Sequence, residues 1–114
     1  MQAGRFDIDA LNRELKDAVK RGVVKIGART TIKALKSGAA AAVIIANNCP
    51  KSLREKIRES SPNDVLFYEY PAGHRELGFA CGKPFAIASL CILNRDEVSG
   101  IMRILSGEDE EQHR

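Results

Sequence analysis

The sequence predicts an α/β fold, a three-layer α-β-α sandwich in which four strands form one sheet between helices. Helical and extended apolar patterns alternate along the chain as αβαβαβαβα. The run AAAAVIIA at 39–46 is continuously apolar, as is typical of a strand buried on both faces. The length of 114 residues fits one domain, since single domains commonly have about 100 to 150 residues.

The first helix is predicted over 8–19, where apolar residues form one stripe and charged residues surround it. Asp7 is the expected N-cap residue, because its side chain can accept a hydrogen bond from the first turn. Gly22 is the expected stop signal. A short strand follows at 23–26, and Gly27 ends it.

A second helix is predicted over 28–36, with Gly38 just after its end. The apolar run at 39–46 then forms the second strand. A turn follows at 47–50, because asparagine tolerates a positive φ and proline restricts the residue before it. The third helix is expected over 52–60, where apolar side chains are spaced i, i+4 among charged ones.

The second half of the chain continues the alternation. VLFYEY at 65–70 and FAIASLCIL at 85–93 predict the third and fourth strands. Turn residues enclose a short helix at 74–81, and a final helix is expected over 96–105, with apolar residues on one face. The charged tail 107–114 is expected to be disordered, because it has too little apolar surface to pack.

Composition and cysteine usage exclude several classes of protein. The chain has no run of about 18 apolar residues, which a membrane span needs. At the N-terminus, acidic residues come before any apolar stretch, whereas a secretory signal has basic residues followed by an apolar run. Cys49, Cys81 and Cys91 lack CxxC spacing, which favours buried thiols over disulfides or a zinc site. We therefore expect a cytoplasmic protein with no metal, no cofactor and no membrane partner.

The net charge of +3 is unevenly distributed along the chain. Residues 1–38 contain nine Lys and Arg against four Asp and Glu, whereas residues 95–114 contain three against six. A cationic N-terminal third suits a polyanionic partner such as a nucleic acid.

The start of the second predicted helix carries positive charge, whereas helix starts usually carry acidic residues. Arg29 lies in the first turn and Lys33 one turn later, where acids would suit the helix dipole. Free N–H groups at a helix start attract anions, and an arginine can bind phosphates or base edges. Gly27 leaves room for another backbone, and Thr30 and Thr31 add hydroxyls. Alternatively, Gly27 only turns the chain, Thr30 caps the helix and both cations are solvated.

Further loops meet at the same edge if the sheet is parallel around its centre. These loops are the turn at 47–50 and the segments 73–76 and 82–85. Asn48 can read a base edge, and Phe85 offers an apolar platform for an unstacked base. Alternatively, Asn48 is a positive-φ turn residue and Phe85 is a core residue at the start of a strand.

Enzyme chemistry has little support in the sequence. HExxH, GxSxG and Walker patterns are absent, and Gly27 lacks the further glycines of a nucleotide-binding loop. His74 and Cys81 can be imagined as the nucleophilic pair of a thiol-dependent enzyme, but an exposed turn histidine explains His74 better. We predict that the protein is not an enzyme and has no small-molecule substrate.

Three segments taken in order resemble a known family. They are KIGARTTIKALKSG, then AVIIANNCP, then VLFYEYPAGHRELGFACGKPF. In order and spacing, over roughly residues 10–95, they are similar to the archaeal and eukaryotic large-subunit ribosomal protein family L thirty e. This family belongs to a superfamily of kink-turn RNA-binding proteins that includes the L seven Ae proteins. The resemblance implies a mixed four-stranded sheet and binding to a kink-turn, an RNA internal loop that tandem sheared G·A pairs bend sharply.

The resemblance also implies which residues contact the RNA. The first group approaches the stem with the G·A pairs, and the loop groups hold the backbone and the extruded nucleotide. The first group is Gly27, Ala28, Arg29, Thr30, Thr31 and Lys33. The loop groups are Asn48, Cys49 and Pro50, then Lys83, Pro84 and Phe85. We add the turn of Gly73, His74, Arg75 and Glu76 because it is expected at the same edge of the sheet.

One departure distinguishes this chain from the L seven Ae branch. That branch has Asn-Glu where this chain has Ala28 and Arg29, so the acid-to-guanine contact of that branch cannot form here. We therefore predict a single RNA-binding domain at 1–106, a structural constituent of the large ribosomal subunit that stabilises a kink-turn in rRNA beside neighbouring ribosomal proteins. The alternative is a free kink-turn protein that regulates mRNA or scaffolds a small ribonucleoprotein.

Overall fold

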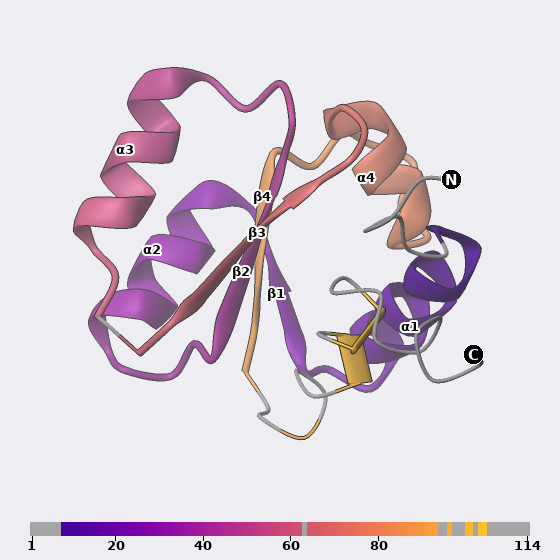
Figure 1. The fold of residues 1–114 in the computed structure, drawn as a ribbon, viewed down its shortest axis with the longest axis horizontal. Coiled ribbons are helices and arrows are strands. Elements are labelled where there is room, and N and C mark those ends of the chain that lie inside the picture. Colours follow the sequence, from indigo (N-terminus) through magenta and orange to yellow (C-terminus); the bar gives the residue numbers. More distant parts are fainter. Residues whose placement is uncertain (1–7, 63, 94–95, 97–99, 102, 105–114) are drawn as a thin grey trace, which may run out of the picture.

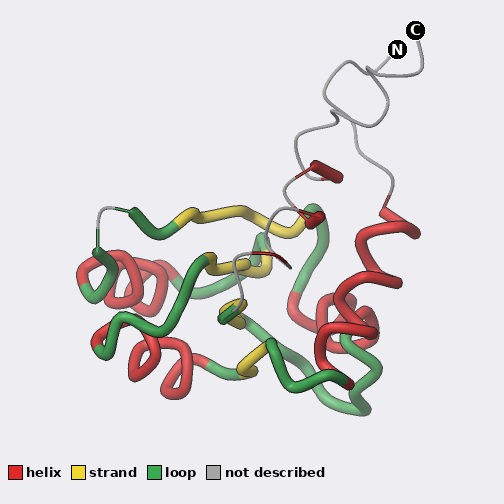
Figure 2. Tube along the Cα trace, turned by 90° about the horizontal axis from the view of Figure 1, so that it is seen from below, coloured by secondary structure: helices red, strands yellow, loops and turns green. Residues whose placement is uncertain are grey.

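The computed structural model describes residues 8–62, 64–93, 96, 100, 101, 103 and 104. Helices and strands alternate as α1 (Ile8–Lys20), β1 (Val24–Ile26), α2 (Ala28–Lys36), β2 (Ala42–Ala46), α3 (Lys51–Glu59), β3 (Leu66–Tyr70), α4 (His74–Ala80) and β4 (Ser89–Ile92). Figure 1 shows α2 and α3 on one side of the sheet and α1 and α4 on the other. The perpendicular view in Figure 2 shows the strands between the two helical layers. The predicted three-layer α-β-α sandwich is confirmed.

The sheet is mixed, as the resemblance implied, with strand order β1-β4-β2-β3. β2 and β3 are parallel, whereas β4 is antiparallel to both β1 and β2. The assumption that the sheet is parallel around its centre is therefore wrong. Because β1, β2 and β3 still run in one direction, their carboxyl ends meet the start of β4 at one edge. We call this the loop edge; it comprises residues 27–30, 47–51, 71–76 and 83–88, which are the loops at this edge and the first turns of the helices that follow them.

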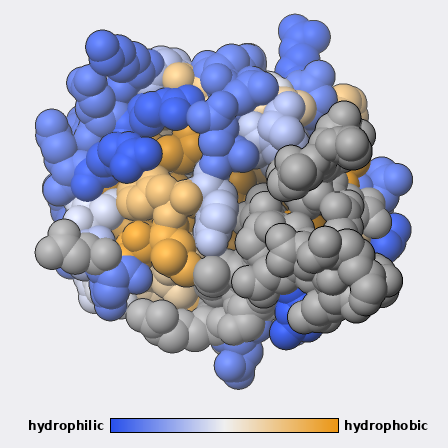
Figure 3. Space-filling model, in the orientation of Figure 1, coloured by the Kyte–Doolittle hydropathy of each residue, from blue (hydrophilic) through white to orange (hydrophobic). Residues whose placement is uncertain are grey.

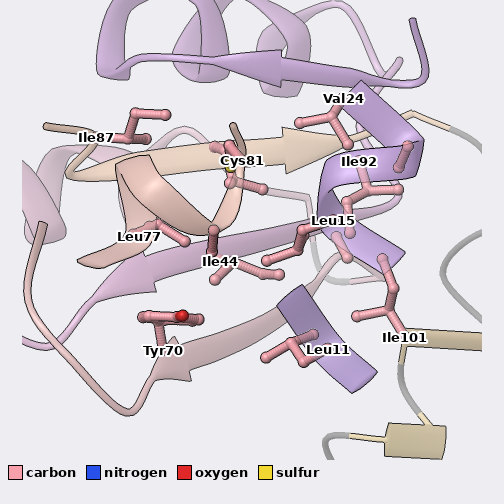
Figure 4. Close-up of a cluster of buried hydrophobic side chains, with 14 of the residues drawn as sticks. Leu11, Leu15, Val24, Ile44, Tyr70, Leu77, Cys81, Ile87, Ile92 and Ile101 are labelled. Atoms are coloured by element: carbon pink, nitrogen blue, oxygen red, sulfur yellow. The ribbon is translucent and has the colours of Figure 1, made fainter. Parts of the chain in front are cut away.

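β2 joins the two halves of the core. Ile44 packs into the cluster on the side of α1 and α4, whereas Val43 and Ile45 pack into the cluster on the side of α2 and α3. All five residues of β2 are buried, which confirms a strand buried on both faces. Figure 4 shows Leu15 of α1 and Leu77 of α4 directed toward the sheet around Ile44.

All four strands are shorter than predicted, by one residue at β1 and β3 and by more at β2 and β4. The run at 39–46 becomes a strand only at Ala42, because the Ala39 N–H still donates to the Ala34 carbonyl of α2 (2.9 Å). The run at 85–93 becomes a strand only at Ser89. The Ile87 N–H donates to the His74 carbonyl (2.9 Å) and so holds residues 85–88 against α4, away from the sheet ladder.

The final helix is described in part. Residues 96, 100, 101, 103 and 104 are helical, in agreement with the helix predicted over 96–105, and Ile101 and Ile104 are buried in the cluster that contains Leu11. Asp7 and the tail 107–114 lie outside the described residues. In Figure 3 hydrophilic residues cover the outer side of α2 and α3, as amphipathic helices require. Within the described part of the chain, no helix is long and apolar enough to cross a bilayer.

Candidate nucleic-acid interface

The start of α2 depends on Gly27. This N-cap residue has φ 103° and ψ 153°, a conformation almost restricted to glycine. The Gly27 N–H donates to the Ser89 carbonyl (2.9 Å), and its own carbonyl accepts from the Thr31 N–H (2.9 Å). No side-chain cap is present, and the first turn holds no acid, so the first N–H groups can meet an anion. The alternative in which Thr30 caps α2 is wrong, because Thr30 lies inside the helix.

The side chains of α2 divide between solvent and core. Arg29 and Thr30 are exposed in the first turn, and Lys33 is exposed one turn further along the helix. Thr31 is fully buried, because its position on α2 faces the sheet, and its hydroxyl lies beside the Cys91 thiol. The expectation that Thr31 presents a hydroxyl at the interface is therefore wrong.

Asn48 links two loops of the loop edge. Its Oδ1 accepts a hydrogen bond from the His74 N–H (2.9 Å), and a Cβ on Gly73 would lie 3.0 Å from its Nδ2. Asn48 therefore caps α4 from the neighbouring loop, and its Nδ2 remains the donor for a ligand. Among the described residues, only glycines have a positive φ, so the alternative explanation of Asn48 as a positive-φ residue is wrong.

Replacing Asn48 with alanine is expected to lower the free energy of unfolding by about 0.5–2 kcal/mol, the usual cost of losing a helix cap. Asn48→Asp is the matched control, because a carboxylate keeps the acceptor at the start of α4 but removes the donor. Urea unfolding should find Asn48→Asp close to wild type in stability, and RNA titration should find it weaker in binding. An alanine variant as stable as wild type would contradict the cap.

Cys49, at the loop edge, and Cys81, at the far end of α4, are core residues. Cys49 packs in the cluster between α2, α3 and the sheet, and burial raises the pKa of its thiol, so its side chain belongs to the core; the RNA contact predicted for Cys49 stays a prediction. Burial raises the pKa of Cys81 to about 11, so this thiol is protonated at neutral pH and is not an activated nucleophile. His74 opens α4, and Cys81 follows its other end. These facts contradict the thiol-enzyme hypothesis.

The segment 83–88, which precedes β4, packs closely against α4 at Gly78. A Cβ on Gly78 would collide with the carbonyl oxygen of Phe85, and the Lys83 N–H donates to the Gly78 carbonyl (3.0 Å). The backbone of this segment is therefore fixed, while the Phe85 side chain stays 54% exposed. The alternative that Phe85 belongs to the core is wrong. The role of Gly78 as the contact point is visible only in the structure.

Three helices begin at the loop edge, because each follows a strand whose carboxyl end lies there. Their first turns carry exposed cations, Arg29 in α2, Lys51 in α3 and Arg75 in α4. None of the three N-cap residues makes a side-chain cap hydrogen bond. The sequence interpretation missed Lys51, although a cation directly after the turn at 47–50 repeats the pattern of Arg29.

The loop edge brings most of the predicted residues to the surface. The exposed or half-buried residues there are Gly27, Ala28, Arg29, Thr30, Asn48, Pro50, Gly73, His74, Arg75, Glu76, Lys83, Pro84 and Phe85. Free N–H groups and cations suit phosphates, and an exposed aromatic ring suits an unstacked base. This combination is typical of an RNA-binding surface.

The sequence of the chain is similar to those of known ribosomal proteins. The sequence matches the family described as Ribosomal protein L7Ae/L30e/S12e/Gadd45 family over residues 9–102. It is 38% identical over 86 residues to Large ribosomal subunit protein eL30 of Methanosphaerula palustris, covering 75% of this chain and 88% of that protein. It is 41% identical over 87 residues to the eL30 of Methanosarcina mazei, covering 76% and 82%.

A solved structure shares the fold. The Giardia lamblia 15.5kD RNA binding protein superposes with a TM-score of 0.65 at 19% identity, covering 91% of this chain and 87% of that chain. The sequence match and this architecture agree, and the chain belongs to the ribosomal protein L7Ae/L30e/S12e/Gadd45 family.

Proposed function

We propose that the protein is a structural constituent of the large ribosomal subunit that binds and stabilises a kink-turn in rRNA through its loop edge. Similarity to two archaeal eL30 proteins supports the ribosomal assignment. The observation that carries the RNA-binding surface is the convergence of three helix starts, each with an exposed cation in its first turn. The protein then acts in cytoplasmic ribosomes, as a ribonucleoprotein component during translation.

The contacts divide between phosphates and bases. The N–H groups at the start of α2 and the cations Lys51 and Arg75 hold phosphates, which supply affinity without sequence information. Arg29 and the Asn48 Nδ2 are donors for base edges. Phe85 provides a face on which an unpaired base stacks. A bent loop presents all three partners at once, whereas a straight duplex presents phosphates and minor-groove base edges but no unpaired base for stacking.

A kink-turn RNA is expected to bind at least about tenfold more tightly than a matched duplex in which Watson–Crick pairs replace the sheared G·A pairs. Both RNAs have similar numbers of phosphates, so the difference in affinity measures recognition of the bent RNA shape and of the accessible bases. Fluorescence anisotropy with both RNAs at one salt concentration measures it. Equal affinity for the two RNAs would contradict the proposed function.

A second measurement separates ribosomal assembly from a free regulatory or scaffolding role. A constituent of the large subunit should co-sediment with that subunit in a sucrose gradient of cell extract. A protein that stays at the top of the gradient, yet binds kink-turn RNA, would favour the alternative role.

A further inference from the structure

Two aromatic rings form one hollow beside the loop edge. Among the described residues, Phe79 and Phe85 are the exposed large hydrophobic side chains, 75% and 54% accessible. Both line a hollow of about 260 Å³, together with Arg75, Lys83, Pro84 and Ala86. Exposed apolar surface beside charged residues marks an interaction site more often than isolated exposed residues do.

The backbone holds the two aromatic residues in place. Phe79 lies on α4 next to Gly78, the residue against which the Phe85 carbonyl packs. The Gly82 N–H donates to the Phe79 carbonyl (2.9 Å), and the Lys83 N–H donates to the Gly78 carbonyl (3.0 Å). The two walls of the hollow are therefore built on one continuous, hydrogen-bonded turn of the chain.

We propose that this hollow takes one unpaired base of the bound RNA, with Phe79 as a second stacking residue beside Phe85. The inference rests on the proposed function, which it extends to a residue outside the predicted interface. Aromatic faces stack on any base, and nearby cations hold its phosphates. Two cations and no carboxylate line the hollow, so its charge favours a nucleic acid over an uncharged apolar peptide.

The Phe79 side chain can be tested without disturbing the fold, because most of its surface is in solvent. Phe79→Ala is expected to weaken kink-turn binding by about 5- to 150-fold, the range for one lost base–aromatic stack. Phe79→Tyr keeps the ring and should bind within about twofold of wild type. Phe79→Leu should resemble Phe79→Ala, since it keeps an apolar side chain but removes the aromatic face.

The base is identified with RNAs that carry an abasic site at each unpaired nucleotide in turn. One of these RNAs should bind wild type more weakly than intact RNA binds Phe79→Ala, because it loses the stack on Phe85 as well, and on it the two proteins should bind equally. Unchanged affinity of Phe79→Ala for intact RNA would overturn the inference and favour a protein partner for the hollow. A loss that persists on every abasic RNA would also overturn it.

Failure of this inference is distinct from failure of the proposed function. If wild type does not distinguish a kink-turn from the matched duplex, the proposed function fails. If wild type does distinguish them and Phe79→Ala binds as well as wild type, only the role of Phe79 fails. Thermal or urea unfolding of each variant confirms that the proteins compared are folded.

Discussion

Replacing Gly78 with alanine is expected to lower the free energy of unfolding by about 1–3 kcal/mol and to weaken RNA binding at the same time. In most helices this substitution stabilises, by roughly 0.5–1 kcal/mol. The sign reverses here because the added Cβ would collide with the Phe85 carbonyl oxygen. That oxygen belongs to the backbone, so the collision is relieved only by moving α4 away from the segment before β4.

The displacement also accounts for the expected effect on binding. Phe85 and Lys83 lie on the segment that must move, and the Lys83 N–H loses its optimal partner, the Gly78 carbonyl. Urea unfolding should show a lower midpoint with an unchanged slope. RNA titration should be done where the variant is folded, so that the loss in affinity reports the shifted loop.

Gly100 provides the matched control for Gly78. It is also helical, but a Cβ there would meet none of the residues that the structure describes within 4 Å. Gly100→Ala is therefore expected to be neutral or to stabilise by up to about 1 kcal/mol, with unchanged RNA binding. A Gly78→Ala protein that matches Gly100→Ala in stability would show that α4 does not pack closely on the Phe85 backbone.

Local patterns predict much of this fold because they reflect contacts close in sequence. The helix predicted over 28–36 has the observed bounds Ala28–Lys36, since its spacing of apolar residues and the glycines at its ends are local signals. The apolar run that contains Ile44 correctly predicts a strand buried on both faces. The alternation of helices and strands then leaves few architectures other than three layers.

Features that depend on distant residues were not predictable in the same way. The direction of β4 follows from pairing with β1 and β2, which no local pattern encodes. Phe85 reads as a strand residue, yet the hydrogen bond between Ile87 and His74 holds its segment on α4. Asn48 reads as a turn residue, yet its Oδ1 caps a helix 26 positions away. At the candidate interface, sequence patterns therefore predicted the right loops but not how they are joined.

Replacing Arg29 with alanine is expected to weaken kink-turn binding by about 1–3 kcal/mol, the value of one good bidentate base contact. The free energy of unfolding should stay unchanged or rise by a few tenths of a kcal/mol at low salt. The two effects have opposite signs because the Arg29 cation lies in the first turn of α2, at the positive end of the helix dipole. Arg29 is also exposed, so its loss creates no cavity.

Two further variants separate the shape of the arginine from its charge. Arg29→Lys keeps the cation but loses the planar fork, so it should bind phosphates yet lose most of the preference for a kink-turn over a matched duplex. Lys36→Ala removes a cation from the other end of α2. It should lower the affinity for the kink-turn and for the matched duplex slightly and by the same factor. If Arg29→Lys keeps the full preference for the kink-turn, Arg29 acts through charge alone, and the base contact must come from another donor such as Asn48. If Arg29→Ala binds RNA more weakly and is at least as stable as wild type, then the Arg29 cation contributes to RNA binding although it is unfavourable at the start of α2.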